Sequence, residues 1–199
     1  CQRQNTDPLE RLGALRQRFF SAPRSMGAHP LAVQRQADVM PQHAAYRENL
    51  RWWQQGVLFV TVHTVGPDDN AKDASAALQR AHATRTAANI DWLRSSFDQA
   101  RQQSAKALVV ATQADVFKDG RRTDSPPPVR KPYRELITRT LLPLAAASRV
   151  PVLYIHGDSH RYIVDQPFVD AADRPIRQIW RLQVPGEERM HAVKVGVQP

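Results

Sequence analysis

The stretch "GVLFVTVHTV" at residues 56–65 decides the fold class of this chain. Residues 57–62 are apolar apart from Thr61, and a run of this kind is typical of a strand that is covered on both faces. The segment before it, residues 46–55, predicts another strand, with a turn at residues 54–56 between the two. The region therefore predicts a pair of strands whose second member is buried.

Helices and strands alternate after this pair. A long helix is expected to begin near Asp73 and to run to about Gln103, because apolar side chains repeat there at helical spacing. Further buried strands are predicted in "AKALVVATQ" (residues 105–113) and "PVLYIHGDSH" (residues 151–160). A helix is expected between them, and Pro143 should either kink this helix or begin a new turn. This order predicts an α/β protein with a layered mixed β-sheet flanked by helices.

The remaining segments complete the expected fold. Residues 7–20 predict a short helix, and residues 21–45 are expected to be mostly loop. The helix that contains the kink is expected over residues 133–148. Near the carboxyl end, residues 176–184 and 189–197 alternate apolar and polar side chains, which predicts a β-hairpin with one buried face.

The composition indicates a single domain over residues 1–199. The hydrophobic fraction of 42% suffices for a globular interior, and no stretch approaches the roughly 20 apolar residues that cross a bilayer, so no membrane span is expected.

The chain has 28 Lys and Arg against 19 Asp and Glu, and its net charge of +9 favours anionic ligands. Because the basic residues are scattered and no zinc-finger or RNA-binding signature accompanies them, we do not expect nucleic-acid binding.

Cys1 is the one cysteine of the sequence, so no internal disulfide can form. Its position fits two interpretations, the lipid-attachment site of a processed lipoprotein or the point at which a longer chain has been cut. No signal peptide in the sequence decides between them. Exported, periplasmic and cytoplasmic locations all stay open, and so does the oligomeric state.

Polar side chains follow each of the three buried strands, at the point where the strand ends. In open α/β sheets, binding groups gather at these carboxyl ends. Imidazole and oxygen donors of this kind are the ligands that Mn²⁺, Fe²⁺ and Zn²⁺ accept. The candidates are His63, Asp68, Asp69 and Asn70 after the first strand, Gln113 and Asp115 after the second, and His156, Asp158 and His160 after the third.

Structural explanations compete with these roles. A histidine in an apolar strand, such as His63, is more often a hydrogen-bonded core residue than a ligand, and Asp68 and Asp69 suit a turn. Gln113 could simply end its strand. A serine-histidine-aspartate triad around Ser159 is conceivable, but the sequence has no G-x-S-x-G elbow.

The segments "AKALVVATQADVF" (105–117) and "PVLYIHGDSHRYIVDQPF" (151–168) together resemble the carboxyl-terminal half of calcineurin-like metallophosphoesterases. In that superfamily one strand ends in a metal-binding histidine, and a later strand ends in a Gly-His-x-His motif. A divergent bacterial branch is more similar still. Its members carry a Gly-Asp-Asn-x-Trp-x-Asp-Cys segment before a stretch like "DPLERLGALRQRFF", and Cys1 would be the last residue of that segment.

The resemblance implies a set of metal ligands. His160 matches the last histidine of the Gly-His-x-His motif, and Asp158 stands at the place of its first histidine. Gln113 stands where the earlier histidine is found, and a neutral amide oxygen should hold a transition metal less well. His156 could compensate as a ligand, and Arg161 could bind the phosphate of the substrate. Further candidates for phosphate binding are Lys118, Arg121 and Arg122.

The resemblance also implies a function. In the family, two divalent transition metals (Mn, Fe or Zn) activate water and clamp a small phosphorylated substrate, so the intact protein would hydrolyse a phosphomonoester or a phosphodiester. The family has an αββα sandwich, and its Asp-x-His and Gly-Asp-x-x-Asp motifs would precede Cys1, so residues 1–199 are expected to be inactive alone. The alternative is a degenerate phosphoesterase-like domain that binds an anionic ligand or partner without catalysis. A third alternative is a complete domain of different build that shares only part of the resemblance.

Overall fold

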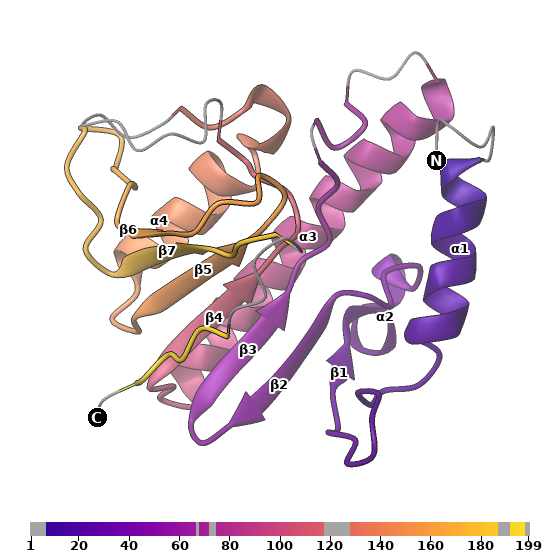
Figure 1. The fold of residues 1–199 in the computed structure, drawn as a ribbon, viewed down its shortest axis with the longest axis horizontal. Coiled ribbons are helices and arrows are strands. Elements are labelled where there is room, and N and C mark those ends of the chain that lie inside the picture. Colours follow the sequence, from indigo (N-terminus) through magenta and orange to yellow (C-terminus); the bar gives the residue numbers. More distant parts are fainter. Residues whose placement is uncertain (1–6, 67, 72–74, 118–127, 187–191, 198–199) are drawn as a thin grey trace.

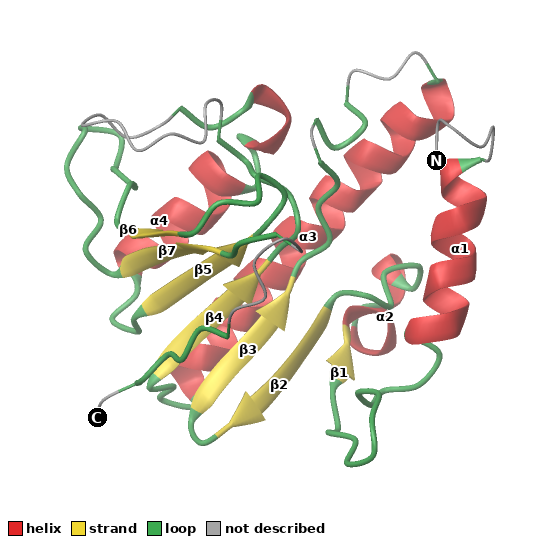
Figure 2. Ribbon diagram, in the orientation of Figure 1, coloured by secondary structure: helices red, strands yellow, loops and turns green. Residues whose placement is uncertain are grey.

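A computed structural model describes residues 7–66, 68–71, 75–117, 128–186 and 192–197. The described residues build one β-sheet with helices packed against it (Figures 1 and 2). The sheet has seven strands in the order β1-β2-β3-β4-β5-β7-β6. The strands are β1 Gln34–Arg35, β2 Leu50–Gln54, β3 Val57–Thr61, β4 Ala107–Ala111, β5 Val152–His156, β6 Ile163–Asp165 and β7 Ile179–Gln183.

The sheet is mixed, with a parallel centre and antiparallel edges. Strands β3, β4, β5 and β7 run parallel to one another. Strand β2 pairs antiparallel with β1 and β3, and β6 pairs antiparallel with β7. Parallel neighbours need a crossover, which α3 supplies between β3 and β4. The predicted α/β class with a layered mixed sheet is therefore confirmed.

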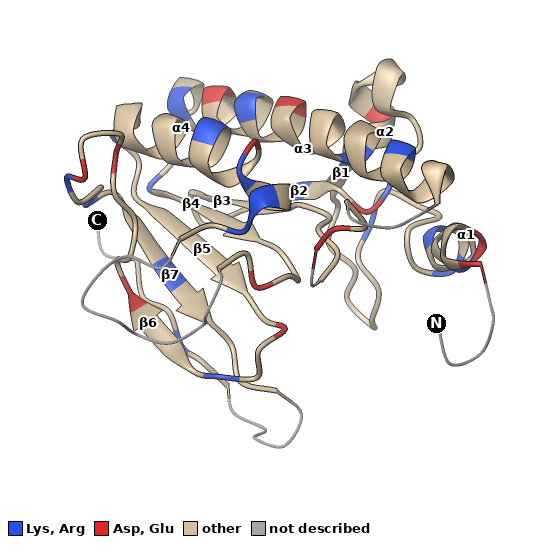
Figure 3. Cartoon of the chain, turned by 90° about the horizontal axis from the view of Figure 1, so that it is seen from above, with Lys and Arg blue, Asp and Glu red and all other residues tan. Residues whose placement is uncertain are grey.

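Helices cover one face of this sheet, where α3 and α4 lie along the same side (Figure 3). The side chains of Leu58 and Leu108 on that face share a core with Trp92 and Phe97 of α3. Within the described ranges, no helix combines the length and the apolar character that crossing a membrane requires. The helical segments are α1 Pro8–Phe19, α2 Gln36–Val39, η2 Pro41–His43, α3 Ala76–Gln102, η3 Lys131–Tyr133, η4 Ile137–Leu141 and α4 Leu142–Ala147.

Local sequence explains where most elements begin and end. Asp7 caps α1 by accepting a hydrogen bond from Leu9 N at 2.9 Å. Ser75 caps α3, whereas Asp73, near which this helix was expected to start, lies outside the described residues. Gln55 and Gly56 have φ values of 51° and 83°, as a tight two-residue hairpin between β2 and β3 requires. The turn predicted at residues 54–56 is confirmed.

The helix expected over residues 133–148 is broken into shorter pieces. A π-helical turn, η4, precedes α4, and Pro143 lies in the first turn of α4. Proline has no N–H to donate to the carbonyl of Arg139, so a continuous α-helix loses a hydrogen bond there. Leu141 N instead donates to Leu136 O at 2.9 Å, five residues back. The kink expected at Pro143 is thus a change of helix type.

The hairpin predicted for residues 176–184 and 189–197 is wrong. Strand β7 pairs with β5 and β6, and the described residues 192–197 contain no strand. Both faces of β7 contain buried residues, since Arg181 and Gln183 are buried like Ile179 and Leu182, whereas Trp180 is 47% exposed. Arg181 can be buried because Asp165 of β6 accepts two hydrogen bonds from it, at 2.7 and 2.5 Å.

The face of the sheet opposite α3 carries an apolar row. Strand register places Phe59, Val109 and Leu153 side by side across β3, β4 and β5. Trp52 of β2 extends the row at one end, stacked on Phe59 with ring centroids 5.2 Å apart. Trp180 of β7 extends it at the other end. The sheet therefore has apolar side chains on both faces.

Candidate functional site

The carboxyl ends of β3, β4 and β5 meet through a small set of hydrogen bonds. Gln113, after β4, accepts one from Gly66 N at its side-chain oxygen, at 3.3 Å. Its backbone oxygen accepts another from Gly157 N at 3.1 Å. Asp158 accepts a hydrogen bond from Asp115 N at 3.2 Å. The structure thus brings Gln113 and Asp158 to one place, the edge at which the sequence predicts a site.

Asp158 lies at the centre of this edge with an exposed side chain. Its backbone has φ of 74°, a left-handed conformation that aspartate adopts more readily than most residues. Next to it, the Ser159 hydroxyl donates to the buried carboxylate of Asp115, which also accepts from Phe117 N at 3.1 Å. The Ser159 hydroxyl is therefore bonded to a carboxylate, which is a different arrangement from a nucleophile bonded to a histidine.

His160 and Arg161 lie further along the same loop. His160 has φ of 54°, and its ring lies so close to Gly186 that a Cβ at that glycine would collide with it. This places His160 against the segment after β7. Arg161 is exposed. The other candidates for phosphate binding, Lys118, Arg121 and Arg122, lie outside the described residues.

Among the described residues, no three His, Cys, Asp or Glu side chains come close enough together to hold a metal ion. The strand ends offer the Asp158 carboxylate and the Gln113 amide oxygen, and both already accept backbone hydrogen bonds. By themselves these residues do not fit a two-metal centre, and such a centre would need further ligands.

His156, a candidate ligand from sequence, points into the interior. Its side chain is fully buried and its ring packs on Tyr154 and Phe117, with centroids 5.5 and 5.9 Å away. Burial lowers the pKa of His156, and the nearby Asp115 carboxylate opposes this shift. His156 is therefore a core residue whose ring is turned into the interior, near the Asp115 carboxylate.

Buried polar atoms surround His156. Its register partner on β7 is Gln183, and Arg181 lies over the Phe117 ring at 4.6 Å. Among the described residues, His156 Nε2, Arg181 Nη1 and both amide atoms of Gln183 have no hydrogen-bond partner. Ordered water usually satisfies buried groups of this kind. The cluster is an interior polar region that lies below the exposed edge, and Asp115 interacts with both His156 and Asp158.

Near the edge, the candidate His63 is joined to Glu48 and Arg16, two residues that the sequence did not indicate. The carboxylate of Glu48 lies 2.7 Å from His63 Nδ1 and accepts two hydrogen bonds from Arg16, at 2.8 and 2.6 Å. Burial alone would raise the pKa of Glu48, but the hydrogen bonds from His63 and Arg16 outweigh it and lower the pKa to about 2. Glu48 is therefore ionised at neutral pH and holds the His63 ring in place.

Buried amides hold the backbone of His63. Asn49 accepts from His63 N at 2.8 Å, and Asn89 donates to His63 O at 2.7 Å. Asn49 donates in turn to Asn89 and to Gln36, at 2.9 and 2.8 Å. All three amide side chains are 0 or 1% exposed. Only their burial marks these three amides as members of a network. A sequence does not show which amide side chains will be buried, so sequence analysis could not predict the network.

The loop that follows β3 is held by Asp69. Its side chain accepts from Val65 N at 2.9 Å and from Arg85 of α3 at 3.0 Å, and its other oxygen lies 2.8 Å from His82 Nδ1. Tyr133 adds a hydrogen bond to Val65 O at 2.5 Å, and burial raises the pKa of its phenol. Asp69 is thus a structural residue, as the turn interpretation expected.

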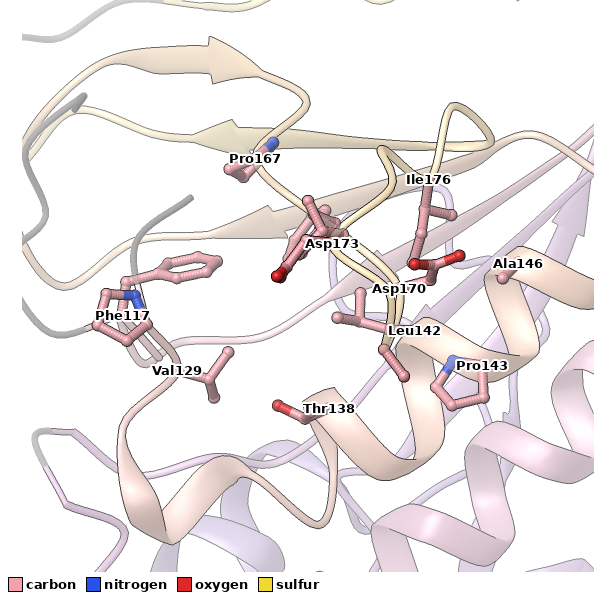
Figure 4. Close-up of a pocket in the computed structure, with 14 residues that line it drawn as sticks. Phe117, Val129, Thr138, Leu142, Pro143, Ala146, Pro167, Asp170, Asp173 and Ile176 are labelled. Atoms are coloured by element: carbon pink, nitrogen blue, oxygen red, sulfur yellow. The ribbon is translucent and has the colours of Figure 1, made fainter. Parts of the chain in front are cut away.

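A cavity of about 570 Å³ lies elsewhere, beside α4 (Figure 4). Phe117, Leu142, Pro143 and Ile176 give it apolar walls. Two acidic residues, Asp170 and Asp173, also line it, and Asp170 is bonded to Arg174 at 2.8 Å. The cavity shares no lining residue with the edge around Asp158, and its chemistry suits neither a metal nor a phosphate.

Gly66 allows the close approach of Asp158. A Cβ at residue 66 would collide with the Asp158 carboxylate, so Gly66→Ala should push this carboxylate away and break its bond with Asp115 N. Because the carboxylate is the end of an exposed side chain, we expect the free energy of unfolding to fall by no more than about 1 kcal/mol. Chemical denaturation measures this change. A loss of several kcal/mol would show that Asp158 cannot move aside.

Comparison of the chain with models of protein families, with curated proteins and with solved structures finds no match.

Proposed function

We propose that this chain is part of a metal-dependent phosphoesterase that hydrolyses a small phosphomonoester or phosphodiester. The observation that carries the proposal is the meeting of Gln113 and Asp158 at the carboxyl edge of a parallel sheet, linked through Gly66 and Asp115. This edge is where α/β proteins bind ligands. It is also where the resemblance to calcineurin-like metallophosphoesterases puts ligands.

In this proposal, Asp158 and Gln113 supply oxygen ligands, His160 supplies an imidazole, and Arg161 contributes charge for the phosphate. Two divalent transition metals would activate water and bind the phosphate when present. The ligands that the described residues lack would come from the segment that the resemblance places upstream of Cys1. Nucleic acid is not among the proposed partners, because the basic side chains are spread over several elements (Figure 3).

The apolar row on the face of the sheet opposite α3 supports the proposed sandwich. Phe59, Val109 and Leu153 lie side by side on that face; Val109 is only 6% exposed, whereas Trp180 at the end of the row is 47% exposed. A sheet with helices on one face and apolar side chains on the other usually packs against a further layer. A second sheet, as in an αββα sandwich, would cover this row.

Metal content tests the proposal. The 199-residue chain and a version extended upstream of Cys1 are purified and analysed for Mn, Fe and Zn, and both are assayed with 4-nitrophenyl phosphate and its diester. We expect close to two metal ions per molecule and hydrolysis in the extended protein alone, since this chain supplies only part of the ligand set. If the extended protein binds no metal, the proposal is wrong.

The alternative function is a phosphoesterase-like domain that binds an anion without catalysis. One contact favours it, because the Gln113 amide oxygen is already bonded to Gly66 N. Replacing Gln113 with histidine in the extended protein separates the two functions. In an enzyme the new imidazole should raise metal affinity, whereas in a site that no longer assembles the affinity should stay unchanged.

A further inference from the structure

A groove of about 380 Å³ lies between α1 and the carboxyl ends of β3 and β4. The α1 side contributes the apolar side chains of Leu12, Leu15 and Phe20, and the strand side contributes His63 and Gln113. Small-molecule sites have this character, with mostly apolar walls and a few oriented polar groups. Gln113 makes the groove continuous with the edge around Asp158.

The bond to Glu48 determines which nitrogen of His63 is available. An ionised carboxylate can only accept, so His63 Nδ1, 2.7 Å from Glu48, must carry the proton that it donates. In the neutral imidazole, Nε2 is then left with a lone pair. Within the described part of the chain, Nε2 has no hydrogen bond, and the side chain is 16% exposed.

Other polar groups in the groove are already bonded. The Thr61 hydroxyl donates to Glu48 O at 2.9 Å, and the Thr64 hydroxyl accepts from Ala114 N at 3.1 Å. Arg16 is engaged with the Glu48 carboxylate, which balances its charge. When the His63 imidazole is neutral, a ligand in the groove therefore meets an acceptor at its Nε2 and amide hydrogens at Gln113 Nε2.

These features define the chemistry of a ligand. The partner of a neutral His63 Nε2 must be a hydrogen-bond donor, and a deprotonated anion has no proton to donate there. A hydroxyl group has the matching chemistry, because its O–H can donate to an acceptor such as His63 Nε2 and its oxygen can accept from an amide such as Gln113. The apolar side chains of α1 favour an aromatic or aliphatic body next to that hydroxyl.

We propose that the groove binds an uncharged aryl or alkyl hydroxyl compound, the alcohol part of the substrate, whose O–H donates to His63 Nε2. This assignment rests on the proposed function, since the alcohol is the group that leaves when a phosphoester is hydrolysed. It narrows the substrate class to phosphoesters of apolar alcohols or phenols. His63 is then a binding residue for the leaving group.

Phenol binding tests the assignment without metal or hydrolysis. The metal-free 199-residue chain is titrated with phenol, and the ring signals of His63 are followed by NMR. We expect saturable shifts with a Kd of about 1 mM, typical of a ligand of this size. Anisole has the same ring but no O–H donor, so it should bind roughly 3- to 10-fold more weakly.

Variants locate the site. His63→Leu removes the acceptor and should weaken phenol binding by roughly 3- to 10-fold. His43→Leu is the matched control, because His43 also bonds to a carboxylate, Asp91 at 2.8 Å, but lies outside the groove. Leu15→Glu should weaken binding as well, and Leu15 is 49% exposed, so this variant is expected to fold.

Each outcome decides something. The assignment is overturned if phenol leaves the His63 signals unchanged, if anisole binds as tightly as phenol, or if His43→Leu weakens binding as much as His63→Leu. If phenol binds but the extended protein never takes up metal, the groove is a binding site for hydroxyl compounds and the proposed phosphoesterase function is wrong. If the extended protein hydrolyses phosphoesters with metal but the chain does not bind phenol, the proposed function stands and the assignment of the groove is wrong.

Discussion

Replacing Arg85 with methionine should lower the free energy of unfolding by about 3–5 kcal/mol. The Arg85 side chain is 2% exposed and donates to both the carboxylate and the backbone oxygen of Asp69, at 3.0 and 2.7 Å. Methionine fills similar space but leaves the buried Asp69 charge without its main partner. Chemical denaturation at neutral pH measures the loss.

A double variant separates lost charge pairing from lost packing. Asp69→Asn removes the charge but keeps an oxygen that can accept from Val65 N, and asparagine tolerates the φ of 54° at this position. We expect the Arg85→Met/Asp69→Asn protein to be more stable than Arg85→Met alone, since no buried charge is then left unpaired. A change below about 1 kcal/mol in Arg85→Met would contradict the importance of the pair.

Glu48→Gln should destabilise the protein by about 3 kcal/mol at pH 7. The His63 and Arg16 hydrogen bonds hold the folded-state pKa of Glu48 at about 2, against an ordinary value of 4.5. Glutamine keeps the shape but loses the charge that these bonds favour. The variant should also loosen α1, because Arg16 joins this helix to Glu48 and α1 has no fully buried residue.

The effect of Glu48 should depend on pH in a defined direction. A carboxyl group whose pKa is lower in the folded state stabilises fully above its unfolded-state pKa and loses that contribution as the pH falls toward the folded value. The stability difference between the natural protein and Glu48→Gln should therefore be constant above about pH 5 and shrink below about pH 4.5. Denaturation of both proteins at several pH values tests this, and a difference that grows on acidification would contradict it.

The class of fold was predictable because it depends on local apolar patterns. The runs at residues 57–62, 107–111 and 152–155 are strands, wholly or for the most part, and the long apolar helix pattern became α3. Burial of such apolar runs is favourable in almost any α/β arrangement. The local sequence is therefore enough to predict that they form buried strands. The polar residues after each strand were likewise predictable as an edge, since parallel strands end on the same side.

The pairing of the last strand was not predictable in this way. Alternation in this segment predicts that Trp180 and Leu182 are buried. Leu182 is buried, but Trp180 is 47% exposed, and the side chain of Arg181 is buried as well. Its burial depends on Asp165, 16 residues away, and on the Phe117 ring. A buried charge is stable only with its partners in place, and sequence alternation contains no information about them.

The candidate site likewise has features that the sequence predicts and features that only the tertiary structure determines. The sequence alone determined that donors would gather at the carboxyl edge of a mixed α/β sheet, because strand direction and apolar runs are local properties. Only the tertiary structure decided that Gln113 and Asp158 lie together, that His156 turns inward, and that Glu48 orients His63. The reason is physical: hydrophobic burial is encoded by neighbours in the chain, whereas a hydrogen-bonded polar group depends on partners that folding brings from far away.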